Sequence, residues 1–194
     1  MPSKRIPFGW RDYAPMNNII EGTPFLPFKV PLTFASVPID CRFNFNDLYR
    51  KAETIGLIDN KRIGLIVDLT FTTRYYNFKK EVIDKNIEYA KIPMSGGNSA
   101  PSESDFKIFA RIVDRFLLKN PNGTIGVHCT HGLNRTGYMI CRYMMEKWAI
   151  SADDAIGRFE SGRGYKITRE HLVAALRLIE RRQMQERSFS YSFD

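Results

Sequence analysis

Residues 128–137 read His-Cys-Thr-His-Gly-Leu-Asn-Arg-Thr-Gly, with five residues between Cys129 and Arg135. The short apolar segment 124–127 before it predicts a buried strand, and residues 138–145 after it have the pattern of a helix. A loop between a strand and a helix N-terminus directs several backbone N–H groups at one point, where the helix dipole also favours negative charge. The stretch therefore predicts a binding site for a phosphate group.

The side chains of this loop suit it to phosphoryl chemistry. Convergent N–H groups favour an anion, so we expect the Cys129 thiol to have a lowered pKa and to attack phosphorus as a thiolate. Arg135 carries a planar set of donors that can hold two phosphoryl oxygens at once, which a lysine cannot do. The Thr136 hydroxyl can hydrogen-bond the sulfur as it leaves. We predict these three residues to be catalytic.

The remaining loop residues are expected to bind phosphate or to shape the loop. Gly132 can adopt backbone conformations closed to most other residues. We expect His128 and Asn134 mainly to hold the shape of the loop. The predicted substrate-binding set within the loop is Thr130, His131, Gly132, Leu133, Asn134 and Arg135.

Two simpler interpretations compete with a nucleophilic cysteine. A lone cysteine is usually a small buried side chain, and we interpret Cys41 and Cys141 in this way. His128, Cys129 and His131 could also ligate zinc, but they crowd into four residues. The whole chain has three cysteines and three histidines, too few for a second ligand pair at workable spacing. We therefore predict no metal and no cofactor.

The loop resembles that of the cysteine-dependent phosphatases, and its specific form resembles their RNA 5′-triphosphatase branch. That branch includes the triphosphatase part of metazoan mRNA capping enzymes, a baculovirus RNA phosphatase and the RNA/ribonucleoprotein-interacting phosphatases, which are grouped with the atypical dual-specificity phosphatases. The likeness is greatest to the last group. It runs from about residue 8 to about residue 175, through segments 9–13, 28–32, 66–70, 74–76, 126–143, 153–156, 158–159 and 163–164. The resemblance implies a phosphorylated cysteine and no metal.

A general acid is absent where phosphatases of phosphoproteins carry one. Those enzymes typically place an Asp on a loop upstream of the cysteine, whereas residues 93–101 here contain no carboxylate. A positioned acid is worth about two to four orders of magnitude when an alkoxide leaves. Diphosphate, in contrast, leaves a phosphoanhydride as a stable anion. The sequence therefore favours an anhydride such as a 5′-triphosphate.

Three carboxylates outside that segment are possible proton donors. Glu103 and Asp105 are typical of the acidic first turn of a helix. Asp68 ends an apolar strand and is expected to organise the active site through hydrogen bonds, with proton donation as a secondary role.

Composition indicates one globular domain. The chain has 194 residues, of which 43% are hydrophobic and 13% aromatic. No apolar run reaches membrane-spanning length, and the N-terminus does not resemble a signal peptide. Three cysteines fit a reducing, intracellular compartment. The family resemblance adds the nucleus as the expected location, with the cytoplasm as the alternative, and we expect a monomer.

The charge balance is basic. A net charge of +8, from 29 basic and 21 acidic residues, suits RNA or its polyphosphate end, because Lys and Arg replace condensed counterions. A charge excess of this size is also common on solvated surfaces. The expected partners are RNA with a 5′-triphosphate or diphosphate end and RNA-processing ribonucleoproteins.

The order of elements predicts an α/β fold with a central, mainly parallel, twisted sheet flanked by helices, as in dual-specificity phosphatases. The expected strands are 24–30, at an edge because of its prolines, 63–69, 87–93 and 124–127. The expected helices are about 45–57, 103–119, 135–148, 152–160 and 168–185, with Ser151 capping the fourth. In the second helix, Ile108 is placed on the apolar stripe.

The ends of the chain are expected to differ from this body. Residues 1–23 form an extended arm, with Phe8, Trp10 and Tyr13 packed on the body. Residues 24–185 form the single catalytic domain, and residues 186–194 a mobile tail.

Basic and aromatic residues on neighbouring loops are candidates for gripping the substrate. Arg74, Tyr75 and Tyr76 follow the second strand, and bases can stack on tyrosine, although core packing explains the tyrosines equally well. Arg163 and Arg169 lie around a turn and a helix start. We predict Arg169 as a second phosphate ligand, with a surface salt bridge as the alternative.

These features together predict a metal-independent RNA 5′-triphosphatase. Cys129 attacks the γ-phosphorus, Arg135 and the loop amides hold the phosphoryl group, and water then hydrolyses the cysteinyl phosphate. The resemblance implies that the β-phosphate is removed next. Two alternatives stay open: a phosphatase of phosphotyrosine or phosphothreonine, and a non-catalytic module that binds RNA 5′ ends.

Overall fold

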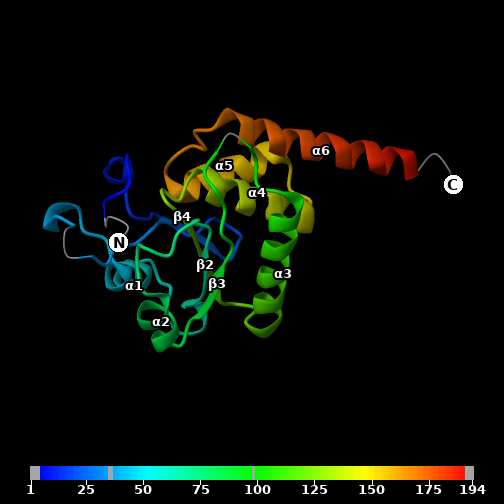
Figure 1. Ribbon diagram of the computed structural model, residues 1–194. Coiled ribbons are helices and arrows are strands. Elements are labelled where there is room, and N and C mark those ends of the chain that lie inside the picture. The colour runs from blue at the N-terminus through cyan, green and yellow to red at the C-terminus, as the bar shows by residue number, and fades with distance from the viewer. Residues whose placement is uncertain (1–4, 35–36, 98, 191–194) are drawn as a thin grey trace.

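Four parallel strands form the centre of the structure, in the order β1–β4–β2–β3 (Figure 1). The computed structural model describes residues 5–34, 37–97 and 99–190. β1, which contains Pro27, lies at an edge as predicted, and the parallel sheet is confirmed. The strands are β1 (Phe25–Lys29), β2 (Ile63–Asp68), β3 (Glu88–Lys91) and β4 (Thr124–Cys129).

Helices cover both faces of this sheet (Figure 1). One face packs against α3 (Glu103–Lys119), α4 (Asn134–Trp148), α5 (Ala152–Arg163) and α6 (Glu170–Ser190), and the other against α1 (Phe45–Thr54), α2 (Phe78–Glu81) and the N-terminal arm. Leu65 and Val67 of β2 face the first group, whereas Ile66 faces the second. A strand buried on both faces was predicted from its continuous apolar run and is confirmed.

Local capping chemistry sets the helix starts. Ser102 and Asp105 form a capping box at the start of α3, and Ser151 caps α5 as predicted. One prediction within α3 is wrong, because Ile108 is 45% exposed. At 3.6 residues per turn, a helix that buries Phe109 turns the side chain before it toward solvent.

The N-terminal arm differs from its prediction at Phe8. This side chain was expected to pack on the body, but it is 99% exposed, whereas Trp10 is fully buried. Gly9 has a left-handed φ of 68° and leads into a 3-10 turn at Trp10–Asp12, which directs the indole rather than the Phe8 ring inward. The indole N–H then donates to the Val30 carbonyl at 2.9 Å.

The C-terminal helix is longer than predicted. α6 begins at Glu170 and continues to Ser190, past the predicted end at residue 185, so the first part of the predicted tail is helical. Residues 191–194 lie outside the described residues, and the division into arm, domain and tail stays a prediction. No helix in the described part of the chain is long and apolar enough to cross a membrane.

A cavity at the amino ends of the strands is not the site that the sequence predicts. It measures about 770 Å³ and is lined by residues such as Asp59, Arg62 and Glu88, with no cysteine or histidine. Cys129 lies at the opposite, carboxyl end of β4. Parallel α/β sheets bind their ligands at that end.

Candidate active site

The predicted loop joins β4 to α4. Cys129 is the last residue of β4 and is 3% exposed, and α4 begins at Asn134. Gly132 has a φ of +67°, and a Cβ atom there would lie 2.2 Å from the Phe28 carbonyl oxygen. Glycine is therefore required because β1 approaches the loop so closely.

The loop makes the Cys129 thiol more acidic. Burial opposes ionisation of the thiol, but the Arg135 guanidinium, the Thr136 hydroxyl and the amides of Thr136 and Leu133 outweigh it. The pKa of Cys129 is therefore lowered from its ordinary value. This is the property that a cysteine nucleophile needs.

The Thr136 hydroxyl is buried beside this sulfur. Its oxygen has no hydrogen-bond partner among the described residues. The hydroxyl nevertheless lies close enough to the Cys129 sulfur to lower the pKa of that thiol. A hydroxyl can rotate, so its proton can turn toward a charged sulfur. Stabilisation of the leaving sulfur by Thr136 stays a prediction.

Backbone carbonyl groups fix the Arg135 guanidinium. Its Nη1 donates to the Leu69 carbonyl at 3.2 Å and to the Met94 carbonyl, and its Nη2 donates to the Thr130 hydroxyl at 3.5 Å. These bonds set the plane of the guanidinium at the mouth of the loop. Bidentate binding of a phosphoryl group requires such a fixed plane.

A second arginine, Arg163 of α5, holds the loop from behind. It is fully buried, and its Nε and Nη2 donate to the Gly132 and His131 carbonyls at 3.1 Å each. In a trans peptide the carbonyl and the following N–H point in opposite directions. The bonds to Arg163 therefore turn the next amides into the loop, so Arg163 is a positioning residue rather than the substrate contact considered from the sequence.

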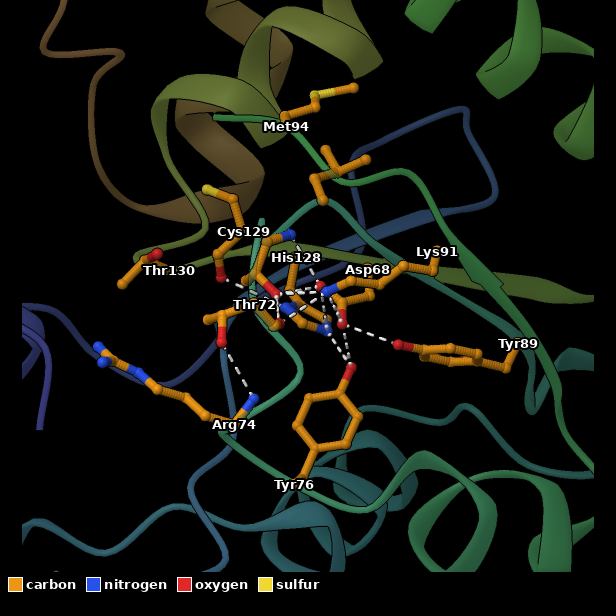
Figure 2. Close-up of polar contacts among 12 residues, drawn as sticks. Asp68, Thr72, Arg74, Tyr76, Tyr89, Lys91, Met94, His128, Cys129 and Thr130 are labelled. Carbon is orange, nitrogen blue, oxygen red and sulfur yellow. Dashed lines mark hydrogen bonds and ion pairs between the residues drawn. The ribbon is translucent and has the colours of Figure 1, made fainter. Parts of the chain in front are cut away.

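Asp68 is the centre of a buried hydrogen-bond network at the carboxyl ends of the strands (Figure 2). Its Oδ1 accepts from the Thr70 backbone N–H at 2.8 Å and from the Thr70 hydroxyl at 2.7 Å. Its Oδ2 accepts from the hydroxyls of Tyr76 and Tyr89 at 2.9 and 2.8 Å and from Lys91 Nζ at 2.9 Å. The carboxylate ties β2 to β3.

His128 connects this network to the nucleophile (Figure 2). Its Nε2 lies 2.8 Å from the Tyr76 hydroxyl, and its Nδ1 lies 3.3 Å from the Cys129 carbonyl oxygen. Burial raises the pKa of Asp68, but His128, Lys91 and Thr70 outweigh it and hold that pKa below its usual range. An ionised, fully bonded carboxylate organises the site, and this geometry gives no support to proton donation by Asp68.

The two downstream carboxylates are also engaged. Asp105 accepts from the Ser102 backbone N–H and hydroxyl at 3.0 and 2.7 Å. Glu103 accepts from Arg142, and this hydrogen bond lowers the pKa of Glu103. Each carboxylate that the sequence raised as a candidate acid thus has a structural partner.

Loop residues also tie neighbouring segments to the site. His131 Nε2 donates to the Phe8 carbonyl oxygen at 2.8 Å, and its ring lies 5.4 Å from that of Tyr13. Asn134 Oδ1 accepts from the Arg169 backbone N–H at 3.0 Å. His131 thus fastens the N-terminal arm, and Asn134 fastens the start of α6. Binding of substrate by these side chains stays a prediction.

The structure places both predicted substrate-binding arginines outside the loop on other partners. Arg74 is exposed, and its Nη2 donates to the Tyr75 hydroxyl at 3.4 Å, away from the Asp68 network (Figure 2). Arg169 Nη1 donates to the Gly97 carbonyl. Their binding of substrate, through phosphate in the case of Arg169, stays a prediction. Tyr75 is 6% exposed and packs in the core, which favours packing over base stacking for this residue.

The sequence did not single out Lys29, the last residue of β1. It pairs in register with Cys129 and is 3% exposed, and its Nζ donates to the Trp10 and Tyr13 carbonyls at 3.1 and 2.7 Å. Burial and the nearby charge of Arg163 lower its pKa to about 8. The sequence feature that could have identified Lys29 is a lysine at the end of an apolar strand. Lys29 fastens the arm to the sheet beside the loop.

Comparison with known proteins identifies the family. A family model described as dual specificity phosphatase, catalytic domain, matches residues 48–182. The chain belongs to the dual-specificity phosphatase family. This phosphatase is 40% identical to the RNA/RNP complex-1-interacting phosphatase homolog of Caenorhabditis elegans, over 97% of this chain and 82% of that protein. It is 37% identical to the tyrosine-protein phosphatase of Autographa californica nuclear polyhedrosis virus, over 88% of this chain and 98% of the viral protein.

Other relatives are longer. The phosphatase spans about half the length of the mouse, bovine and human proteins that it matches. Among solved structures, the active form of Tk-PTP aligns with a TM-score of 0.64 at 17% identity, over 87% of this chain and 98% of that one. The predicted family and fold are confirmed.

Proposed function

We propose that this phosphatase is a metal-independent RNA 5′-triphosphatase in which Cys129 attacks the γ-phosphorus. The observation that carries the proposal is the engagement of the candidate acids. Asp68 accepts five hydrogen bonds, Glu103 binds Arg142, and Asp105 caps α3. Three candidate acids that are all held by structural partners suit a leaving group that needs no proton. Diphosphate-ended RNA meets this condition, whereas the alkoxide of a phosphoester does not.

The reaction runs in two displacements. The Cys129 thiolate donates an electron pair to the γ-phosphorus, and the S–P bond forms as the bond to the β–γ bridging oxygen breaks. That oxygen keeps its electrons and leaves on the diphosphate-ended RNA. Arg135 and the loop amides balance the charge on the equatorial oxygens. Water then attacks phosphorus, the P–S bond breaks, the Thr136 hydroxyl stabilises the departing thiolate, and phosphate leaves with a proton released to solvent.

Two further observations support an RNA substrate. The net charge of +8 favours binding of a polyanion. The nematode relative, 40% identical over 97% of this chain, carries RNA/RNP complexes in its name. We extend the proposal to removal of the β-phosphate and to association with RNA-processing ribonucleoproteins.

Phosphate release from γ-labelled, triphosphate-ended RNA tests the reaction. Wild type releases label at the same rate with and without EDTA, and Cys129→Ser reduces the rate about a thousandfold or more. Release of label without dependence on Cys129 would contradict the mechanism. In a parallel reaction with β-labelled RNA, label should appear after the γ-phosphate. Retention of all β-label would limit the reaction to one step.

A protein phosphatase is the second candidate, because two baculovirus relatives are named tyrosine-protein phosphatases. This function needs a working acid, so Asp68→Ala, Glu103→Ala or Asp105→Ala would abolish hydrolysis of a phosphotyrosine peptide. Asp12→Asn belongs in the same set, because Asp12 of the arm is close enough to His131 to oppose the lowering of the His131 pKa by burial. A preference of only a few fold for triphosphate RNA over the peptide would favour this candidate.

A further inference from the structure

Two exposed phenylalanines lie on segments whose backbone contacts the phosphate-binding loop. Among the phenylalanine side chains that the structure describes, Phe8 and Phe71 are the exposed ones, at 99% and 68%. Phe78 is half-buried, and the others are buried. An exposed aromatic ring beside a binding site is available to a ligand.

The backbone of Phe8 lies directly beside the loop. Its carbonyl oxygen accepts from His131 Nε2 at 2.8 Å, so the loop itself holds this residue. Just beyond, the Trp10 and Tyr13 carbonyls are bound by the buried Lys29 Nζ at 3.1 and 2.7 Å. The backbone is therefore fixed at Phe8 and just after it, while the ring is exposed to solvent.

Phe71 lies on the other side of the loop. It follows β2, which flanks β4 opposite β1, whereas the arm lies along β1. Two residues before it, the Leu69 carbonyl accepts from Arg135 at 3.2 Å, and the Leu69 N–H donates to the His128 carbonyl at 2.8 Å. The neighbouring Thr70 hydroxyl is bound to Asp68 at 2.7 Å. This ring also projects from a fixed backbone.

We propose that Phe8 and Phe71, the aromatic rim, stack on the bases at the 5′ end of an RNA whose triphosphate occupies the loop. This rests on the proposed function and names how that site recognises its substrate. With the γ-phosphate at Cys129, the remaining phosphates and the ribose carry the first base outward to the rim. Aromatic side chains stack on any base, because every base has a π face. The rim therefore favours RNA over free polyphosphate without selecting a sequence.

Inorganic tripolyphosphate distinguishes binding by the aromatic rim from binding by the loop, because it has the same phosphoanhydride but no base. Phe8→Ala and Phe71→Ala are each expected to raise KM for triphosphate-ended RNA about 5- to 100-fold with kcat unchanged. Hydrolysis of tripolyphosphate stays at the wild-type rate. Phe8→Trp keeps the RNA KM near wild type. Leu118→Ala removes an 86% exposed apolar side chain from α3 and is the matched control, with no expected effect.

An unchanged KM for RNA in both alanine variants, or an equal rise for tripolyphosphate, would overturn the aromatic rim. Binding of the same RNA to the Cys129→Ser protein, followed by fluorescence anisotropy, needs no turnover. If wild type releases no phosphate from RNA, the proposed function fails, yet the rim still predicts about 5- to 100-fold weaker binding after either alanine substitution. No measurable RNA binding, or an effect confined to a phosphotyrosine peptide, would overturn both proposals.

Discussion

At the scale of residues, two cysteines of the chain have opposite acidity. Cys129 and Cys141 are both buried. Burial and Glu160 raise the pKa of the Cys141 thiol, whereas Arg135 and the loop around Cys129 outweigh burial and lower the pKa of that thiol. The loop, rather than burial, therefore sets the reactivity of Cys129.

Alkylation by iodoacetamide measures this difference directly. Cys129 should react at pH values below the ordinary thiol range, because its thiolate persists until the pH falls through the lowered pKa, while Cys141 stays unreactive. Rates for each peptide by mass spectrometry, from about pH 5 to 9, give the midpoint. Cys141→Ala is the matched control and should leave the profile of Cys129 unchanged. A Cys129 midpoint near the ordinary value of about 8.5 would contradict the prediction.

Arg163 should act through the loop rather than on the substrate. Arg163→Met keeps an apolar side chain of similar length but removes the hydrogen bonds to the Gly132, His131 and Ala14 carbonyls. We expect kcat/KM to fall roughly 10- to 100-fold, and the free energy of unfolding to fall by roughly 2–4 kcal/mol.

If Arg163 positions the loop, the Arg163→Met substitution should also change the acidity of Cys129. When the loop amides lose their orientation, the pKa of the Cys129 thiol should rise, which the alkylation midpoint reports. A merely structural role would lower stability and leave that midpoint in place. An unchanged midpoint would show that Arg163 does not position the active-site loop.

At the scale of elements, the start of α3 accounts for two acidic residues that could be mistaken for a catalytic acid. Asp105 completes the capping box with Ser102, and Glu103 binds Arg142 on α4. Helix α3 packs on the sheet through Phe106 and Phe109, so its first turn has a fixed place. These acids stabilise the element on which they lie.

Removal of either charge should therefore spare the chemistry. Glu103→Gln and Asp105→Asn are expected to keep kcat for triphosphate RNA within about twofold, because a positioned acid would be worth far more. Asp105→Asn should lower the free energy of unfolding by about 1 kcal/mol through the weakened cap. Ser102→Ala is the matched control, with a similar loss of stability and the same kcat. A loss of kcat of about two orders of magnitude in either carboxylate variant would identify a general acid.

Elements with strong local signals were predictable from the sequence. The buried strand at Ile63–Asp68 and the helices capped by Ser102 and Ser151 follow from apolar runs, helical period and capping residues. The sequence did not reveal α2 (Phe78–Glu81), because four residues are too few to establish a period. The end of α6 at Ser190 was missed because the polar C-terminal residues carry no stop signal.

At the scale of the whole molecule, the loop was predictable because its residues are contiguous, and its supports were not. Arg163 binds a carbonyl 31 residues away, and Phe8 meets His131 across 123 residues. Only the parallel strand order brings Lys29, Asp68 and Cys129 to one edge of the sheet. Single-sequence patterns describe local structure and do not contain these contacts. The exposure of Phe8 was misjudged for the same reason.

The stability of the whole fold should fall as pH falls from about 7.5 to 5.5. Burial lowers the pKa of His128 in the folded state, so below the unfolded value of about 6.5 the unfolded chain binds a proton that the folded chain does not. The contribution of His128 to stability is fully present above that unfolded value. It is lost as the pH falls toward the lowered pKa of His128 in the folded state. Asp68, whose folded pKa is also lowered, adds a further loss below its unfolded value of about 3.9.

Urea unfolding at about pH 7.5, 6.5 and 5.5 measures this fall. His128→Gln removes the titrating ring, so the midpoints of this variant should change less between these pH values. Wild-type midpoints that stay constant or rise on acidification would contradict a lowered pKa for His128 in the folded state.

The most direct test of attack by Cys129 on a phosphoanhydride is to trap the cysteinyl phosphate. Wild type is mixed with γ-labelled, triphosphate-ended RNA and quenched within one turnover, and the protein is digested and mapped. The predicted result is label on the peptide that contains Cys129, none with α-labelled RNA, and none in Cys129→Ser. Phosphate release from the same RNA with no label on that peptide, or label from a phosphotyrosine peptide in place of RNA, would contradict it.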